Sequence, residues 1–217
     1  MQSANQWARN ALIFGSSALC VAALSATLLA QDASLSANVR GGGIDSFQRN
    51  EPGSRIRRSR AVASMDASME QVTAVVSDYA NYRHFMPHFV VSRVLSQRGS
   101  KALIYAEVSA LDGMPNLWVQ MQLQTLDAPN SPRVIKAKMM KGNLKGFAAE
   151  WQMSPLDATH TLVAFELCAE PNFHLPFADG LISDYNEKEA RSTIMGLRQR
   201  LAENARRTAP GVTIVTR

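Results

Sequence analysis

The sequence contains only two cysteines, Cys20 and Cys168, among its 217 residues. Two cysteines cannot build the disulfide framework that holds many small secreted proteins together. The glycine-rich loops that cradle phosphates and the Gly-x-Ser-x-Gly elbow of serine hydrolases are also missing. These absences exclude the common nucleotide-dependent and hydrolase classes, and Cys168 is expected to be a small apolar core residue.

Charged residues make up only 19% of the chain, and its net charge of +5 is unevenly distributed. Residues 31–60 contain six arginines and three acidic residues, whereas residues 61–217 contain 16 basic and 15 acidic residues. A surface that binds nucleic acid needs basic charge concentrated on the folded part of the protein. The nearly neutral body therefore argues against a nucleic-acid partner.

Residues 11–30 contain no charged residue and come after a short start that contains Arg9. These twenty residues approach the length needed to span a bilayer. An apolar run after a short basic start is typical of an export signal or a membrane anchor. Residues 1–30 are therefore expected to send the body to the periplasm or to tether it to a bacterial inner membrane. A tethered body that faces the cytoplasm is the alternative.

Residues 31–60 are expected to form a flexible basic linker, because they combine glycine and proline breaks with no hydrophobic periodicity. Near an anionic membrane surface, each cation contributes about 1 kcal/mol of attraction. The linker is therefore expected either to rest on the membrane or to be a solvated tether. The cations that would make the membrane contact are Arg55, Arg57, Arg58 and Arg60.

Residues 66–87 predict two short helices. Ser68 is a candidate N-cap, with Gln71 at the third position of a capping box. The first helix has an apolar face formed by Val72, Val75 and Val76. The second must end before Pro87, because proline cannot continue a helix. It carries three aromatic residues, namely Tyr79, Tyr82 and Phe85.

Apolar and polar residues then alternate with a period of two, which predicts a series of strands. In residues 117–124, for example, Val119, Met121 and Leu123 alternate with glutamines. The predicted strands cover residues 89–97, 102–111, 117–124, 135–139, 147–153 and 163–167. Short connections rich in turn residues join them, which indicates an antiparallel meander.

The last element, residues 178–207, has no proline and predicts a long amphipathic helix. Its apolar positions recur with helical spacing at Ala190, Ile194, Leu197 and Leu201. Gly196 costs this helix about 1 kcal/mol relative to alanine. This glycine indicates either a close approach to the sheet or a space left in the interior. A curved sheet laid against one helix leaves room for an apolar cavity, the usual kind of small-molecule site.

This order of one strand, two short helices, six strands and a long helix resembles the helix-grip fold of the START-like (SRPBCC) superfamily. The closest similarity is to its polyketide cyclase and coenzyme Q-binding branch. The residues that carry the resemblance are 68–72, 76–79, 85–87, 92–95 and 161–167. It implies an α+β fold, in which a curved antiparallel sheet wraps around the C-terminal helix beneath a two-helix lid. The ligand-binding domain is expected over residues 61–208, followed by a tail over residues 209–217.

The chain is therefore expected to bind or transport a hydrophobic small molecule, such as a lipid, quinone or isoprenoid. Burial of apolar surface, worth about 25 cal/mol per Å², would supply the affinity. No catalytic residue, metal or cofactor is expected. The candidate ligand-binding residues are Tyr79, Tyr82, Phe85, Leu123, Met139, Phe147, Trp151, Phe165, Leu181 and Tyr185.

Two other functions stay open. One is an enzyme of the polyketide cyclase or dehydratase type, which a polar pocket with convergent histidine and carboxylate groups would favour. The other is a protein-interaction module that resembles the ribosome-association toxins. His84 and His88 have the spacing of metal ligands on a helix. Because Pro87 is expected to end that helix, both histidines are expected to be structural or solvated.

Overall fold

The computed structural model describes residues 36–109, 116–129, 131–172 and 179–208. The predicted N-terminal signal or anchor (residues 1–30) and the predicted tail (residues 209–217) lie outside these residues. Within the described ranges, no helix is long and apolar enough to cross a membrane.

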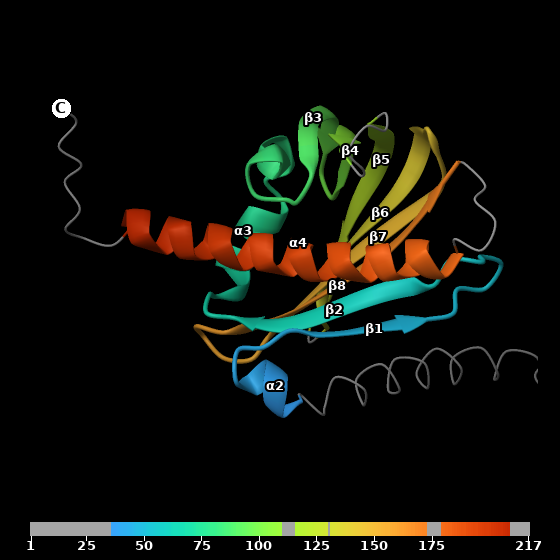
Figure 1. Ribbon diagram of the computed structural model, residues 1–217. Coiled ribbons are helices and arrows are strands. Elements are labelled where there is room, and N and C mark those ends of the chain that lie inside the picture. The colour runs from blue at the N-terminus through green and yellow to red at the C-terminus, as the bar shows by residue number, and fades with distance from the viewer. Residues whose placement is uncertain (1–35, 110–115, 130, 173–178, 209–217) are drawn as a thin grey trace, which may run out of the picture. The chain divides into compact units, whose positions relative to one another are not determined.

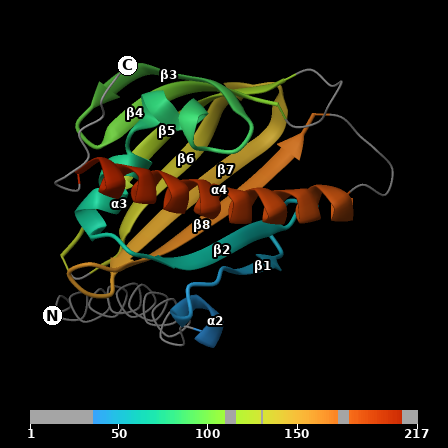
Figure 2. The ribbon, with the colours of Figure 1, turned by 60° about the vertical axis from the view of Figure 1, so that its left-hand side comes forward.

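Eight strands form one antiparallel sheet, in the order β1-β2-β8-β7-β6-β5-β4-β3. Figure 1 shows this sheet bending around the long helix α4, and Figure 2 shows α4 lying across the strands. The predicted α+β helix-grip fold is confirmed. In chain order the elements are α2 (Ala37–Arg40), β1 (Asp45–Arg49), β2 (Arg58–Met65), α3 (Met69–Val76), η1 (Tyr79–His84), β3 (Phe89–Arg98), β4 (Lys101–Val108), β5 (Leu117–Leu126), β6 (Arg133–Gly142), β7 (Leu144–Pro155), β8 (Thr161–Pro171) and α4 (Asp179–Thr208).

The face of the sheet toward α4 is apolar because the strands alternate as the sequence predicts. In β5, Val119, Met121 and Leu123 are buried, and the glutamines between them are more exposed. The same alternation holds in β2, where alternate residues are buried along the whole strand. These inward-facing rows join α3 and one side of α4 in a single hydrophobic core.

The two predicted helices are present, but they differ in type. At the start of α3, Ser68 Oγ accepts a hydrogen bond from the Gln71 amide at 3.3 Å, and Gln71 Oε1 accepts one from the Ser68 amide at 2.9 Å. This pair is the predicted capping box. The second element, η1, is a 3₁₀-helix. It is fixed to α3 because the Tyr82 hydroxyl donates a hydrogen bond to the Val76 carbonyl at 2.5 Å.

The prediction of a flexible linker over residues 31–60 is wrong for its second half, because β1 and the start of β2 belong to the sheet. No apolar alternation marks β1, whose polar side chains instead contact α4. Ser46 Oγ donates to Glu187 Oε1 at 2.6 Å, and Gln48 Nε2 donates to Glu187 Oε2 at 2.8 Å and to Asp184 Oδ1 at 3.1 Å. Hydrogen bonds rather than apolar burial therefore hold this edge strand in place.

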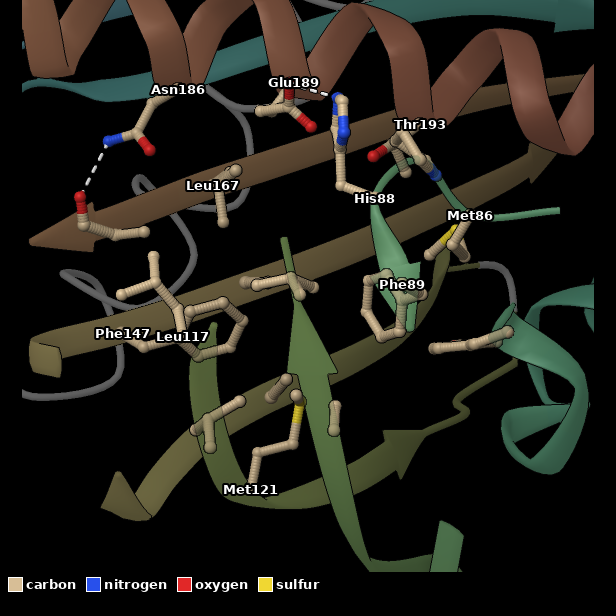
Figure 3. Close-up of a pocket in the computed structure, with 18 of the residues that line it drawn as sticks. Met86, His88, Phe89, Leu117, Met121, Phe147, Leu167, Asn186, Glu189 and Thr193 are labelled. Carbon is tan, nitrogen blue, oxygen red and sulfur yellow. Dashed lines mark hydrogen bonds and ion pairs between the residues drawn. The ribbon is translucent and has the colours of Figure 1, made fainter. Parts of the chain in front are cut away.

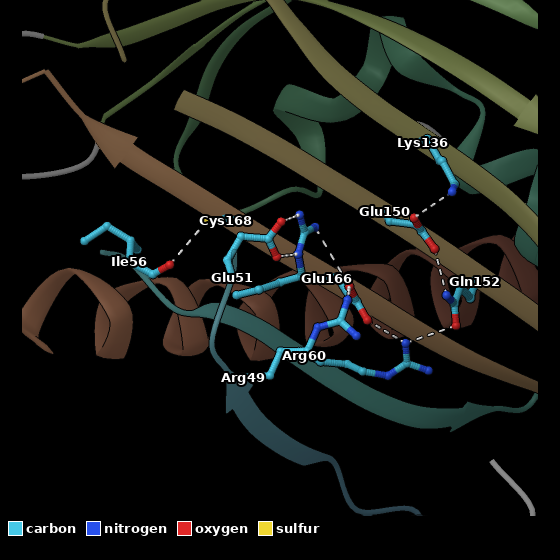
Figure 4. Close-up of polar contacts among 10 residues, drawn as sticks. Arg49, Glu51, Ile56, Arg60, Lys136, Glu150, Gln152, Glu166 and Cys168 are labelled. Atoms are coloured by element: carbon cyan, nitrogen blue, oxygen red, sulfur yellow. Dashed lines mark hydrogen bonds and ion pairs between the residues drawn. The ribbon is translucent and has the colours of Figure 1, made fainter. Parts of the chain in front are cut away.

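Arg58 and Arg60 lie in β2 and are largely buried. Figure 4 shows Arg60 among the ion pairs on the outer face of the sheet. Arg60 Nη1 and Arg49 Nη2 each lie 2.8 Å from the Glu166 carboxylate of β8. Arg58 binds both carboxylate oxygens of Glu51, at 2.6 and 2.9 Å. The prediction that Arg58 and Arg60 contact a membrane is therefore wrong, because their charges are paired inside the domain.

Arg55 and Arg57 precede β2 and are more exposed. Arg55 Nη2 lies 2.8 Å from Asp179 Oδ2, and Arg57 Nη2 lies 3.8 Å from Asp184 Oδ1. These two pairs connect the segment before β2 with the first turns of α4. A membrane contact of Arg55 and Arg57 stays a prediction.

Cys168 and Gly196 are explained by their surroundings. The Cys168 thiol is buried, as predicted, and burial raises its pKa. Gly196 marks a close approach, but to the segment after η1 rather than to the sheet. A Cβ atom on Gly196 would lie 2.2 Å from the Phe85 carbonyl oxygen.

Candidate functional site

An apolar cavity of about 130 Å³ lies between the sheet and the N-terminal half of α4 (Figure 3). Side chains from β4 to β8 form its floor, and the turn between η1 and β3 closes one side. Alanines on four different strands leave space that larger residues would fill. They are Ala106, Ala137, Ala149 and Ala169.

The volume of this cavity limits what it can hold. An engineered cavity of about 150 Å³ takes up benzene, whereas drug-sized ligands occupy sites of about 300–1,000 Å³. A cavity of about 130 Å³ therefore accommodates one small ring system or a comparable part of a larger molecule. A whole lipid would need the wall to open.

Helix α4 buries different residue types in its two halves. The C-terminal half buries apolar residues, namely Ile194, Leu197 and Leu201. The N-terminal half turns Asn186, Glu189 and Thr193 toward the cavity, as Figure 3 shows. These three positions are spaced by three and four residues, so they share one face of the helix. An otherwise apolar cavity thus has one polar side.

His88 reaches this polar side from the turn before β3. Its Nε2 lies 3.4 Å from Glu189 Oε1. The residue has a φ of 59°, a left-handed conformation that is uncommon for residues other than glycine. Its carbonyl accepts a hydrogen bond from the Ser109 amide at 2.9 Å, which holds the turn to the end of β4. Strained backbone of this kind is typical of functional sites.

The surroundings of Glu189 shift the pKa values of Glu189 and of its neighbour Tyr185. Burial raises the pKa of the Glu189 carboxyl group, while His88, Lys188 and the Tyr185 hydroxyl act in the opposite direction. Burial and the neighbouring Glu189 raise the pKa of Tyr185 to about 12. Glu189 Oε1 is buried and receives no hydrogen bond from the part of the chain that the structure describes, since the contact with His88 is close without being aligned as one. A free acceptor atom therefore stands at the polar side of the cavity.

The structure brings together most of the predicted ligand-binding residues. Six of the ten line the cavity: Tyr82, Leu123, Phe147, Trp151, Phe165 and Tyr185. Phe85 and Met139 are partly buried and pack against the core. Tyr79 is buried in the core but does not line the cavity. Leu181 is 71% exposed, so its prediction is wrong; the buried face of α4 passes through Ser183 at this level.

Sequence patterns do not predict that the polar residues His88, Asn186, Glu189 and Thr193 line the cavity. Helical spacing places the three helical residues on the same face of α4 as Ala190 and Ile194, which could have indicated that they are buried. Their polarity indicates the opposite, because polar residues on an amphipathic helix usually face solvent. The position of His88 depends on the geometry of a turn, which no periodicity reports.

The two histidines do not form a metal site together. His84 Nε2 accepts a hydrogen bond from Arg83 Nε at 3.1 Å, whereas His88 faces Glu189. Among the residues that the structure describes, no three His, Cys, Asp or Glu side chains gather as metal ligands do.

Known proteins share both sequence features and the fold of this chain. The family model described as polyketide cyclase / dehydrase and lipid transport matches residues 65–195, more than half of the chain. A STAR-related lipid transfer protein fragment from Xanthomonas axonopodis is 22% identical, with a TM-score of 0.64 over 74% of this chain and 94% of that chain. Human StAR-related lipid transfer protein 5 is 10% identical, with a TM-score of 0.64 over 88% of this chain and 100% of that chain.

A third similar structure is the Zhui aromatase/cyclase from Streptomyces sp. R1128. It is 13% identical, with a TM-score of 0.54 over 78% of this chain and 99% of that chain. Identities this low show a common fold and do not extend to ligands or reactions. The comparison with curated protein sequences finds no significant match.

Proposed function

This chain belongs to the family of polyketide cyclases, dehydrases and lipid transport proteins, and we propose that its cavity binds a hydrophobic small molecule. The observation that carries this proposal is the apolar cavity of about 130 Å³ between the sheet and α4. Proteins with this fold typically bind hydrophobic ligands. The ligand class we propose is a lipid, quinone or isoprenoid, of which one part fills the cavity. A location at or beyond the bacterial inner membrane belongs to this proposal and rests on residues 1–30 alone.

Apolar burial supplies the binding free energy in this proposal. At about 25 cal/mol per Å², each 100 Å² of apolar ligand surface that leaves water contributes about 2.5 kcal/mol. This force has no direction, so affinity follows the apolar area and the shape of the cavity. Ligands of different chemistry but similar size are therefore expected to compete for the same space.

Filling the cavity tests the proposal. Ala149 faces the cavity from β7, and its substitution by leucine places three more carbon atoms in the free space. We expect Ala149→Leu to weaken the binding of naphthalene, a probe of one fused ring system, at least tenfold. Equilibrium dialysis of the full-length chain measures this change.

Ala148→Leu is the matched control, because Ala148 is the neighbouring residue of the same strand and points to the outer face. This variant should bind naphthalene as the wild type does. Circular dichroism confirms that both variants fold. Equal naphthalene affinity in wild type and a folded Ala149→Leu variant would refute binding in this cavity.

A second candidate function, an enzyme of the cyclase or dehydratase type, is favoured by one observation. His88, Glu189 and Tyr185 converge on the cavity, and a histidine beside a carboxylate is a common pair for proton transfer. An enzyme would convert a bound polyketide-like compound, and His88→Gln would abolish that conversion. A carrier would release the compound unchanged. The role of a protein-interaction module stays a prediction.

A further inference from the structure

The polar side of the cavity contains a buried acceptor atom. Glu189 Oε1 receives no hydrogen bond from any residue that the structure describes, a state that native proteins generally avoid. The Tyr185 hydroxyl interacts with the same carboxyl group but does not donate to Oε1, and other nearby donors are engaged elsewhere. Asn186 Nδ2 donates to the Ala169 carbonyl at 3.1 Å, and the Tyr82 hydroxyl donates to Val76. A donor supplied by a bound molecule would complete this arrangement.

The charges around the cavity limit the kind of molecule. None of the described residues that line it is a lysine or an arginine. An acid or phosphate in the cavity would face the Glu189 carboxylate, and His88 is the one basic residue among the described residues that line the cavity. A charged group placed in apolar surroundings without a partner loses its hydration at a high cost. The cavity is therefore a poor place for an anionic headgroup.

From these contacts we infer that the cavity prefers apolar molecules that carry a neutral hydrogen-bond donor, such as a hydroxyl group, directed at Glu189. This inference rests on the proposed function, since it names the ligand class of the same cavity. The apolar floor holds the body of the ligand. Glu189 Oε1 accepts the hydrogen bond from the ligand hydroxyl and fixes its orientation. Ligands that would place an acid or phosphate group inside the cavity are excluded as preferred ligands, whereas alcohols and phenols are included.

Three naphthalene compounds with the same ring system test this inference in the full-length chain. Equilibrium dialysis at pH 7 compares naphthalene, 2-naphthol and 2-naphthoate; a phenolic hydroxyl is protonated at this pH because its pKa is about 10. We expect 2-naphthol to bind about tenfold more tightly than naphthalene, the effect of one hydrogen bond to a carboxylate. We expect 2-naphthoate to bind more weakly than 2-naphthol by a similar factor.

Substitutions at Glu189 then show whether this residue causes the preference for 2-naphthol over naphthalene. Glu189→Met keeps the length of the side chain without the acceptor, so the preference for 2-naphthol over naphthalene should fall to within about twofold. Glu189→Gln retains a neutral acceptor and should keep part of it. Glu203→Met, the same change near the C-terminal end of α4 and away from the cavity, should leave the ratio unchanged.

The outcomes separate this inference from the proposed function. If naphthalene and 2-naphthol bind equally well, the cavity binds apolar ligands and only the inference is wrong. The inference is equally wrong if the preference for 2-naphthol persists in a folded Glu189→Met variant. If neither compound binds, the proposed function fails as well.

Discussion

Glu166→Gln is expected to lower the free energy of unfolding by about 3 kcal/mol. Removing one partner of a buried ion pair costs about 3–5 kcal/mol, because the remaining charge is left uncompensated in a low-dielectric region. The side chain of Glu166 is only 4% exposed, and those of Arg58 and Arg60 are 14% and 11% exposed. The amide still accepts one hydrogen bond from Arg60, which places the expected loss at the lower end. Urea unfolding of wild type and variant measures it.

The neighbouring ion pair on the same strand is the control. Glu170 lies four residues after Glu166 in β8 and pairs with Lys145, whose side chain is 60% exposed. Exposed pairs contribute at most about 1 kcal/mol, so Glu170→Gln should have little effect. A loss for Glu166→Gln as small as that expected for Glu170→Gln would show that the ion pairs of Glu166 with Arg49 and Arg60 (Figure 4) do not stabilise the fold.

Gly196→Ala is expected to destabilise the protein by about 2 kcal/mol, although alanine favours helices by about 1 kcal/mol over glycine. The methyl group would lie 2.2 Å from the Phe85 carbonyl oxygen, where real Cβ atoms stay beyond 3.0 Å. Because the contact is with backbone, no side-chain rotation relieves it. Either α4 or the segment after η1 must move. Thermal and urea unfolding measure the loss of stability.

Gly180→Ala provides the control within the same helix. Apart from the backbone of its own helical turn, no atom of the described residues lies within 4 Å of the position where its Cβ would stand. Only the helix propensity then acts, and this variant should be as stable as the wild type or more stable by up to about 1 kcal/mol. A Gly196→Ala variant that is also stabilised would mean that α4 and η1 do not approach as closely as described.

Local patterns predicted the elements whose stability comes from apolar periodicity. The alternation of Val119, Met121 and Leu123 identifies β5, and the Ser68 capping box identifies the start of α3. In these segments, the residues that drive burial repeat with the period of the backbone. Sequence position alone therefore determines which side chain faces the core.

Periodic patterns do not predict elements that are held in place by polar contacts. The strand β1 owes its place to hydrogen bonds from Ser46 and Gln48 to α4, and Arg60 near the start of β2 pairs with an acidic residue far along the chain. The partner Glu166 is 106 residues from Arg60. Long-range ion pairs leave no periodic signal, which explains why this segment resembles a linker in the sequence.

In the candidate site, too, the apolar residues were predictable from the sequence and the polar residues were not. Its apolar lining residues follow the strand alternation, whereas Glu189 and His88 meet only through the packing of α4 against the turn before β3. The buried Glu166 carboxylate is neutralised by arginines, whereas Glu189 Oε1 receives no hydrogen bond from the described residues. This difference supports a role for Glu189 in the chemistry of the cavity.

The uptake of an apolar molecule between the sheet and α4 is tested most directly by nuclear magnetic resonance of ¹³C-methyl-labelled methionines in the full-length chain. Met86 and Met121 line the cavity, whereas Met140 and Met195 are 56% and 55% exposed. On titration with naphthalene, ring currents should shift the methyl signals of Met86 and Met121 until they saturate, and those of Met140 and Met195 should not move. Unchanged signals from Met86 and Met121, or shifts confined to Met140 and Met195, would contradict ligand binding in the cavity.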